Sequence, residues 1–280
     1  MSTKTTPRWL ETLLREAGYR RCLIVTGNLH DVCLCVDTVE YLPVAEVLGK
    51  SLLRRGFSEI VYWDSFGGVR GIPPERWDEL RKASTFGAKP REEGGQGEAY
   101  DLGPAEKKPT SQEQSVRESA DDFFPVVLRT IVSNPSPRRI AFIIDWSQYL
   151  FGDSRSLSEK ERNWLLILSK IFRASLTESP QEIGRPYHLL VFLDHSSSRV
   201  PSIYFQGNMN VSQVSIPLPG RLEREAFLKN NSTHFRLKSP LIPNDPQIPD
   251  LADALDGFRL RDMLQVCILS LQTSEALTFA

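Results

Sequence analysis

The sequence predicts an α/β fold in which helices cover both faces of a mostly parallel, five-stranded sheet, with a small helical segment at the C-terminal end. Five short apolar runs indicate strands, and most are continuous enough to be buried on both faces of a sheet. Segments with helical periodicity alternate with these runs, which favours parallel strands. Three of the runs end in an aspartate: Asp64, Asp145 and Asp194.

The N-terminal third contains two predicted helices and two predicted strands. The first helix covers about residues 7–18, and a buried strand at 22–25 ends in the turn Gly27 to Asp31. The second helix follows Pro43 and closes at Gly56, and a strand at 59–64 comes after it.

Residues 84–120 have a different composition. They are rich in Gly, Glu, Ser and Lys and hold hardly any aliphatic side chains, so they cannot bury enough apolar surface to offset the entropy of ordering. We expect a flexible insertion within one domain, because strands and helices resume their alternation after it. A linker between two domains is the alternative.

The remaining elements complete the predicted sheet. Helices are expected at 123–132, at 157–176 with Ser158 and Glu161 as a capping box, from Arg221 onward, and along an apolar stripe at 260–271. Strands are expected at 138–145, 187–194 and 211–217. The core then comprises residues 1–83 and 121–235, and residues 236–280 form the helical segment.

Composition limits the class of protein. At 280 residues, the chain suits one large domain or a core with an appendage. Its 40% hydrophobic and 25% charged residues are ordinary for globular proteins, and its net charge of −1 gives no electrostatic reason to expect a nucleic-acid partner. No apolar run reaches the length of about 18 residues that a membrane span needs, so we expect no membrane contact and a cytoplasmic location.

The four cysteines do not indicate a metal site. They form no CxxC pair and have no histidines at ligand spacing, so zinc is not expected. Cys33 and Cys35 are separated by one residue, which places both on one face of an extended strand. Packing in the core is the favoured interpretation over a redox role.

The carboxyl ends of parallel strands are where such sheets bind ligands. The turn with Gly27, Asn28 and Asp31 should therefore share one edge of the sheet with Asp64, Asp145 and Asp194. The run Ile140 to Asp145 also has the form of a Walker B motif, whose carboxylate helps to hold Mg²⁺ beside a nucleotide.

Residues 138–271 resemble the AAA+ ATPases. The run Ile216 to Pro219 followed by a charged helix from Arg221 is similar to the end of the AAA+ core, and residues 251–264 look like the AAA+ lid. The resemblance implies a three-layer P-loop NTPase-like core with a helical lid, and ATP with Mg²⁺ as cofactors. It also implies that Asp194 is a polar sensor, that Arg261 is a second sensor near phosphate, and that Arg199 is an arginine presented to a neighbouring subunit. For both arginines, an exposed surface charge is the alternative.

The N-terminal third resembles the degenerate first module of bacterial tandem AAA proteins. Its Gly27-Asn28-x-x-Asp31 turn and its strand with Tyr62 and Asp64 carry that likeness. Such a module normally precedes a complete ATPase module. The resemblance therefore implies self-association or a complete AAA+ partner, either in a longer chain or as a separate polypeptide.

Two departures from an active ATPase stand out. The sequence has no GxxxxGK[ST] phosphate loop; the fragment closest to it, Gly49-Lys50-Ser51, has Val44 where the motif needs glycine and falls within a helical stripe. Trp146 follows Asp145 where an active enzyme carries a glutamate. We expect impaired hydrolysis.

Three functional hypotheses follow. The first is a degenerate AAA+ module that supplies an assembly or regulatory interface to an active ATPase. The second is a weak ATPase that binds nucleotide through Gly27 to Asp31 or through Gly49 to Ser51. The third is an unrelated α/β enzyme that acts through His30, Asp31 and Asp145.

Overall fold

The computed structural model describes residues 6–85, 116–133, 138–152, 156–173, 188–195, 206–236, 241–242 and 245–272. A six-stranded sheet forms its centre, in the spatial order β5-β4-β6-β7-β1-β8. The strands are β1 (Cys22–Gly27), β4 (Glu59–Asp64), β5 (Gly68–Arg70), β6 (Ile140–Ile144), β7 (Leu189–Leu193) and β8 (Val211–Ile216).

The predicted α/β class and all five predicted strands are confirmed, and these five pair in parallel. The sheet has six strands and not five because the chain reverses after β4, and the short β5 pairs with β4 antiparallel. Gly68 allows this reversal with a φ of +71°, and a Cβ there would lie 2.1 Å from the Val116 carbonyl oxygen. Three residues are too few to show a strand period in the sequence.

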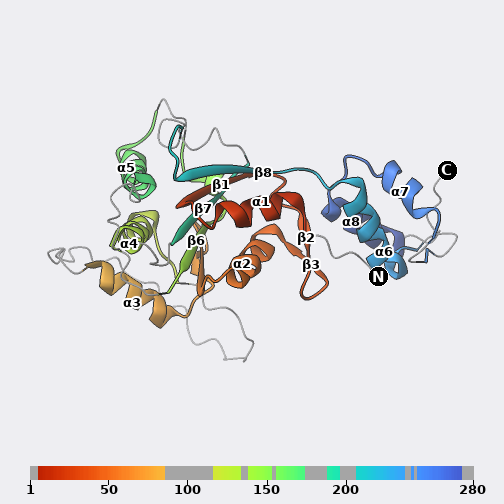
Figure 1. Ribbon diagram of the computed structural model, residues 1–280, viewed down its shortest axis with the longest axis horizontal. Coiled ribbons are helices and arrows are strands. Elements are labelled where there is room, and N and C mark those ends of the chain that lie inside the picture. Colours follow the sequence, from red (N-terminus) through yellow and green to blue (C-terminus); the bar gives the residue numbers. More distant parts are fainter. Residues whose placement is uncertain are drawn as a thin grey trace, which may run out of the picture.

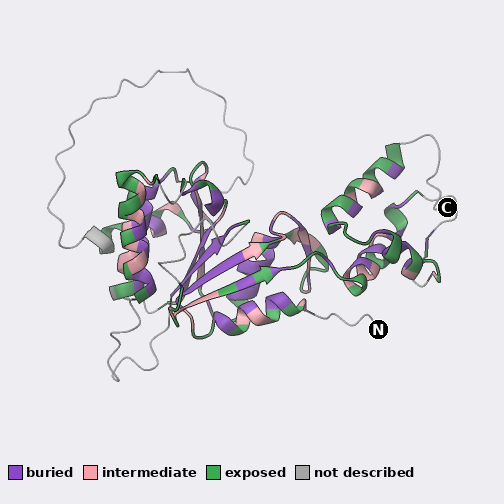
Figure 2. Ribbon diagram, turned by 90° about the horizontal axis from the view of Figure 1, so that it is seen from above, coloured by how far each residue is buried: buried purple, intermediate pink, exposed green. Residues whose placement is uncertain are grey.

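Helices cover the sheet on both faces (Figure 1). One face packs against α3 (Pro74–Thr85), α4 (Ala120–Ser133) and α5 (Glu159–Arg173), and the other packs against α1 (Arg8–Glu16) and α2 (Val44–Arg54). In β6, Phe142 points into the first core, whereas the neighbouring Ile143 points into the second. This alternation explains why the central strands β6 and β7 are apolar throughout, and why most of the sheet is buried in Figure 2.

A hairpin that the sequence analysis did not anticipate lies between β1 and α2. It consists of β2 (Val32–Cys35) and β3 (Glu40–Pro43), which form a separate two-stranded sheet. Cys33 and Cys35 share the buried face of β2, as the spacing predicts.

Three helices gather beyond the end of β8 (Figure 1). They are α6 (Arg221–Asn230), α7 (Ile248–Ala254) and α8 (Leu260–Gln272), and they share a third hydrophobic cluster. Val32 and Tyr41 of the hairpin pack against this cluster, and the Tyr41 ring meets Phe227 edge-on at 4.9 Å. The hairpin thus joins the sheet domain to the C-terminal helices.

Most of the predicted insertion, residues 86–115, lies outside the described residues. Its last part packs against the sheet: Val116 pairs with Val69 in an antiparallel bridge, and the Glu118 carbonyl accepts a hydrogen bond of 2.9 Å from the Trp63 indole nitrogen. The predicted capping box is present at the start of α5, where Ser158 N donates to Glu161 Oε2 at 2.7 Å.

Across the described ranges, no helix is both long and apolar enough to cross a bilayer. The same residues contain no group of three or more His, Cys, Asp or Glu side chains that could hold a metal ion.

His188, just before β7, is a fully buried imidazole that sequence analysis did not single out. Its Nδ1 accepts a hydrogen bond of 3.1 Å from the Ile140 backbone, whereas its Nε2 has no partner among the described residues. Burial, reinforced by the positive charges of Arg21 and Arg139, lowers the His188 pKa to about 4. The folded protein therefore keeps this ring neutral in mildly acidic solution.

This burial predicts an acid-labile fold. Between the ordinary histidine pKa and about 4, the unfolded chain binds a proton that the folded chain does not, so stability falls as pH falls. At pH 5 the loss from this residue should be about 2 kcal/mol. Urea unfolding of wild type and His188→Asn at pH 7 and pH 5 measures it, since Asn retains an acceptor but does not titrate. An equal pH dependence in both proteins would contradict the prediction. The same substitution at the exposed His234, His234→Asn, is the control.

Candidate functional site

The carboxyl edge of the sheet brings most of the predicted residues together. The loops after β1, β4, β6 and β7 all begin there, because these strands are parallel neighbours. Their polar side chains form four groups, around Asp31, Arg70, His30 and Asp194.

Gly27 allows the backbones of β1 and β8 to approach each other closely. Its φ is +96°, and a Cβ at this position would lie 2.4 Å from the Ile216 carbonyl oxygen of β8. That same carbonyl accepts a hydrogen bond of 3.0 Å from the Asn28 backbone. The glycine turn is therefore closed against the neighbouring strand.

The Asp31 carboxylate binds four N–H groups. Within its own loop it accepts hydrogen bonds from the Asn28 side chain at 2.6 Å and from the Val32 backbone at 2.8 Å. From the start of α8 it accepts the backbone N–H groups of Leu260 at 3.1 Å and Arg261 at 2.7 Å. Asp31 is 5% exposed and thus acts as a buried cap that fastens α8 to the end of β1.

Both flanking helices are engaged at this loop. The first N–H of α2, from Val44, reaches the Asp31 carbonyl oxygen at 3.3 Å. The Arg261 guanidinium donates to the His30 carbonyl oxygen at 3.2 Å. Arg261 therefore lies beside the β1 loop, with the His30 carbonyl oxygen of that loop as its partner.

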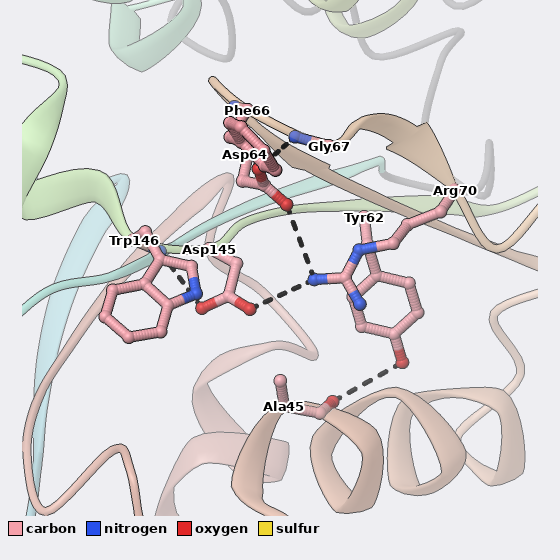
Figure 3. A network of polar contacts seen from close by, with 8 residues as sticks. All are labelled: Ala45, Tyr62, Asp64, Phe66, Gly67, Arg70, Asp145 and Trp146. Atoms are coloured by element: carbon pink, nitrogen blue, oxygen red, sulfur yellow. Dashed lines mark hydrogen bonds and ion pairs between the residues drawn. The ribbon is translucent and has the colours of Figure 1, made fainter. Parts of the chain in front are cut away.

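Arg70 bridges two aspartates at the ends of β4 and β6 (Figure 3). Its Nη2 lies 3.1 Å from Asp145 Oδ2 and 3.7 Å from Asp64 Oδ2, and its guanidinium sits over the Tyr62 ring at 5.4 Å. The other Asp145 oxygen accepts the Trp146 backbone N–H at 3.0 Å. Sequence analysis missed Arg70, because only the reversal into β5 returns it to this edge.

Two histidines distant in sequence meet beside Trp146. The Nε2 atoms of His30 and His195 are 2.7 Å apart, and the His30 ring stacks on the Trp146 indole at 4.3 Å. Burial lowers the His30 pKa, and the charge of His195 lowers it further, whereas Asp145 opposes the shift. The His30 imidazole therefore favours its neutral form.

Asp194 is fully buried and supports a turn. The Ser147 hydroxyl, at the start of the short 3-10 helix η1 (Ser147–Tyr149), lies 2.9 Å from Asp194 Oδ2 and 2.9 Å from the Leu193 carbonyl oxygen. The carboxylate thus ties the loop after β6 to the end of β7.

Two predicted residues lie away from this edge, and a third is not among the residues that the structure describes. Lys50 and Ser51 are in the middle of α2, two turns beyond its start, and Ser51 lines a small cavity against α1. Arg199 lies outside the described residues.

Comparison with known proteins gives one family. A protein-family model described as "AAA+ chaperone, N-terminal Rossmann-like domain" matches residues 2–217. These residues hold the complete central sheet and end at the close of β8. No curated protein matches the chain.

The capping role of Asp31 gives a second prediction. Asp31→Asn should speed amide hydrogen exchange at the start of α8 and lower stability by about 1–2 kcal/mol, because the neutral amide presents one acceptor oxygen to several N–H donors. Exchange followed by mass spectrometry over residues 245–272 measures the effect. Asp37→Asn is the matched control, since Asp37 lies nearby in the turn between β2 and β3 and pairs with Arg54. Unchanged exchange in α8 would rule out the cap.

Proposed function

Because the chain belongs to the family of AAA+ chaperone N-terminal Rossmann-like domains, we propose that it is a degenerate AAA+ module that works by assembly or regulation. It would supply an interface to an active ATPase, either through self-association or through a complete AAA+ module. The contacts of Asp31 carry this proposal.

In the loop after β1, the Asp31 carboxylate occupies N–H donors that a bound phosphate would need. A phosphate loop offers backbone N–H groups to the ligand oxygens, commonly with a lysine. Here the N–H groups at the start of α8 are bound to Asp31, and the first N–H of α2 is bound to the Asp31 carbonyl. A phosphate at this position would meet a buried negative charge instead of open donors.

The residues at this edge also do not fit a magnesium-bound triphosphate. Asp145, which the sequence offers as the Mg²⁺ ligand, has one oxygen on Arg70 and the other on the Trp146 backbone. Trp146 stands in place of the glutamate of active enzymes. The absence of GxxxxGK[ST] from the sequence supports the same conclusion.

The other two hypotheses have less support. Lys50 and Ser51 lie inside α2, so the fragment Gly49 to Ser51 has no open helix start to bind phosphate. For an unrelated enzyme, Asp31 would have to accept a proton while it holds four N–H groups. We therefore do not propose either activity.

Exposed aromatic side chains at the same edge support a role in assembly. Phe66 is 95% exposed, Tyr149 is 73% exposed, and Trp146 is 44% exposed. Tyr149 stacks on Trp146 at 6.1 Å, and Phe66 projects from the β4–β5 turn that holds Asp64. Rigid exposed aromatics are typical anchors of protein interfaces.

The proposal predicts no nucleotide binding by the chain alone. Calorimetric titration with ATP and Mg²⁺ should give no binding heat up to millimolar ligand, and Asp145→Ala should behave in the same way. Binding that disappears in Asp145→Ala would support the weak ATPase instead.

The assembly role has its own test. Mixed with a complete AAA+ ATPase module from the same protein or operon, the chain should form a larger species in light scattering and change the module's hydrolysis rate. The double variant Phe66→Ala, Tyr149→Ala should weaken this association about a hundredfold or more, because buried aromatic anchors each contribute on the order of 2 kcal/mol. Leu166→Ala, at an apolar residue on α5 that is 53% exposed, is the control. Failure to self-associate or to bind the module would exclude the proposed function.

A further inference from the structure

A small cavity lies where the sheet domain meets the C-terminal helices. It has a volume of about 190 Å³ and is bounded by the start of α1, the β2–β3 hairpin, the end of β8 and α6. Trp9, Val39, Tyr41 and Leu222 provide apolar walls, and Ala226 leaves space on the α6 side. The volume is below the roughly 300–1,000 Å³ of drug-sized sites, so it suits a single small ring system.

The polar atoms that line this cavity are mainly acceptors. Asn28 Oδ1 is buried and has no hydrogen-bond partner among the described residues, although its amide nitrogen binds Asp31. Glu223 and Asp31 add two carboxylates. One carboxylate oxygen of Glu223 accepts a hydrogen bond of 2.8 Å from the Gly220 backbone N–H. None of the described lining residues is a lysine or an arginine.

Two lining side chains sense the carboxylates of this cavity. Burial, together with the charges of Glu223 and Asp31, raises the pKa of the Cys33 thiol to about 12. The Tyr41 phenol also has a pKa of about 12, mainly through burial and in part through Cys33 and Glu223. Burial disfavours a charge of either sign, but the two lining carboxylates, Glu223 and Asp31, favour a cation over an anion.

Arg224 of α6 does not line the cavity, and its positive charge is already paired. Its guanidinium binds the carbonyl oxygens of Pro219 and Ala252 and the Asp256 carboxylate. It is therefore not available to an anion in the cavity.

We propose that this cavity binds a small aromatic amine in its cationic form. The ring packs between Trp9, Tyr41 and the aliphatic wall, a ring N–H or amino group supplies the donor that Asn28 Oδ1 lacks, and the ammonium lies near Glu223. This site is separate from the assembly surface and does not depend on nucleotide. An occupant touches both the hairpin and α6, so it stabilises the C-terminal helices against the sheet domain.

Three indole compounds of the same ring and different charge test the proposal. Tryptamine is a cation at pH 7, indole is neutral, and indole-3-acetate is an anion. Calorimetric titration should rank their affinities in that order, with at least a tenfold difference between tryptamine and indole-3-acetate. Equal affinities, or no binding by any of the three, would overturn the proposal.

Variants on α6 connect binding to the cavity. Ala226→Trp should fill it and abolish tryptamine binding. Glu223→Gln should reduce the preference for tryptamine over indole about tenfold while indole still binds, because Gln keeps the acceptor for Gly220 but not the charge. Glu225→Gln is the matched control: Glu225 lies on the same helix, pairs with Arg221 and Lys229, and does not line the cavity. The same effect from Glu223→Gln and Glu225→Gln would show that the preference does not arise in the cavity, and would overturn the assignment.

Discussion

The buried carboxylate of Asp31 is the contact on which the arrangement of the two parts depends. It joins the end of β1 to the start of α8 through four hydrogen bonds, two of them from the helix backbone. Hydrogen bonds to a charged group contribute about 1.5–3 kcal/mol each, and a negative charge is further favoured at a helix N-terminus. The residue that closes the β1 loop therefore also positions the C-terminal helices.

The same contact limits the chemistry of the sheet edge. In a nucleotide site, helix N-termini and a glycine-rich turn present free N–H groups to phosphate. Here Gly27 approaches β8, and the helix N–H groups are bound by Asp31. The hairpin between β1 and α2 then packs its Tyr41 against Phe227 of α6. The segment after β1 therefore holds two parts of the protein together.

Sequence reasoning could predict the sheet but not the pairing of side chains at its edge. Continuous apolar runs such as Ile140 to Ile144 identify buried strands, and parallel order places their ends together. In contrast, β5 is too short to show the two-residue periodicity of a strand. This strand places Arg70 beside Asp145, so the contact could not be predicted. The meeting of His30 with His195 joins residues far apart in the chain, so no local spacing could reveal it. The sequence singled out Asp31 as a candidate nucleotide-binding residue, but its partners in α8 are also far from it in the sequence and could not be predicted.

Asp145 shows why a motif alone does not define a site. A carboxylate after a buried strand can bind a metal ion or a guanidinium. Which of the two it contacts depends on the residues that the tertiary fold places beside it. Arg70 pairs with both Asp64 and Asp145, so one guanidinium offsets part of the negative charge of two carboxylates. What then projects from the edge is aromatic: Phe66, Trp146 and Tyr149. Paired carboxylates and exposed rings are poorly suited to concentrate a magnesium-bound anion and well suited to contact another protein, and this is the basis of the assembly role proposed above.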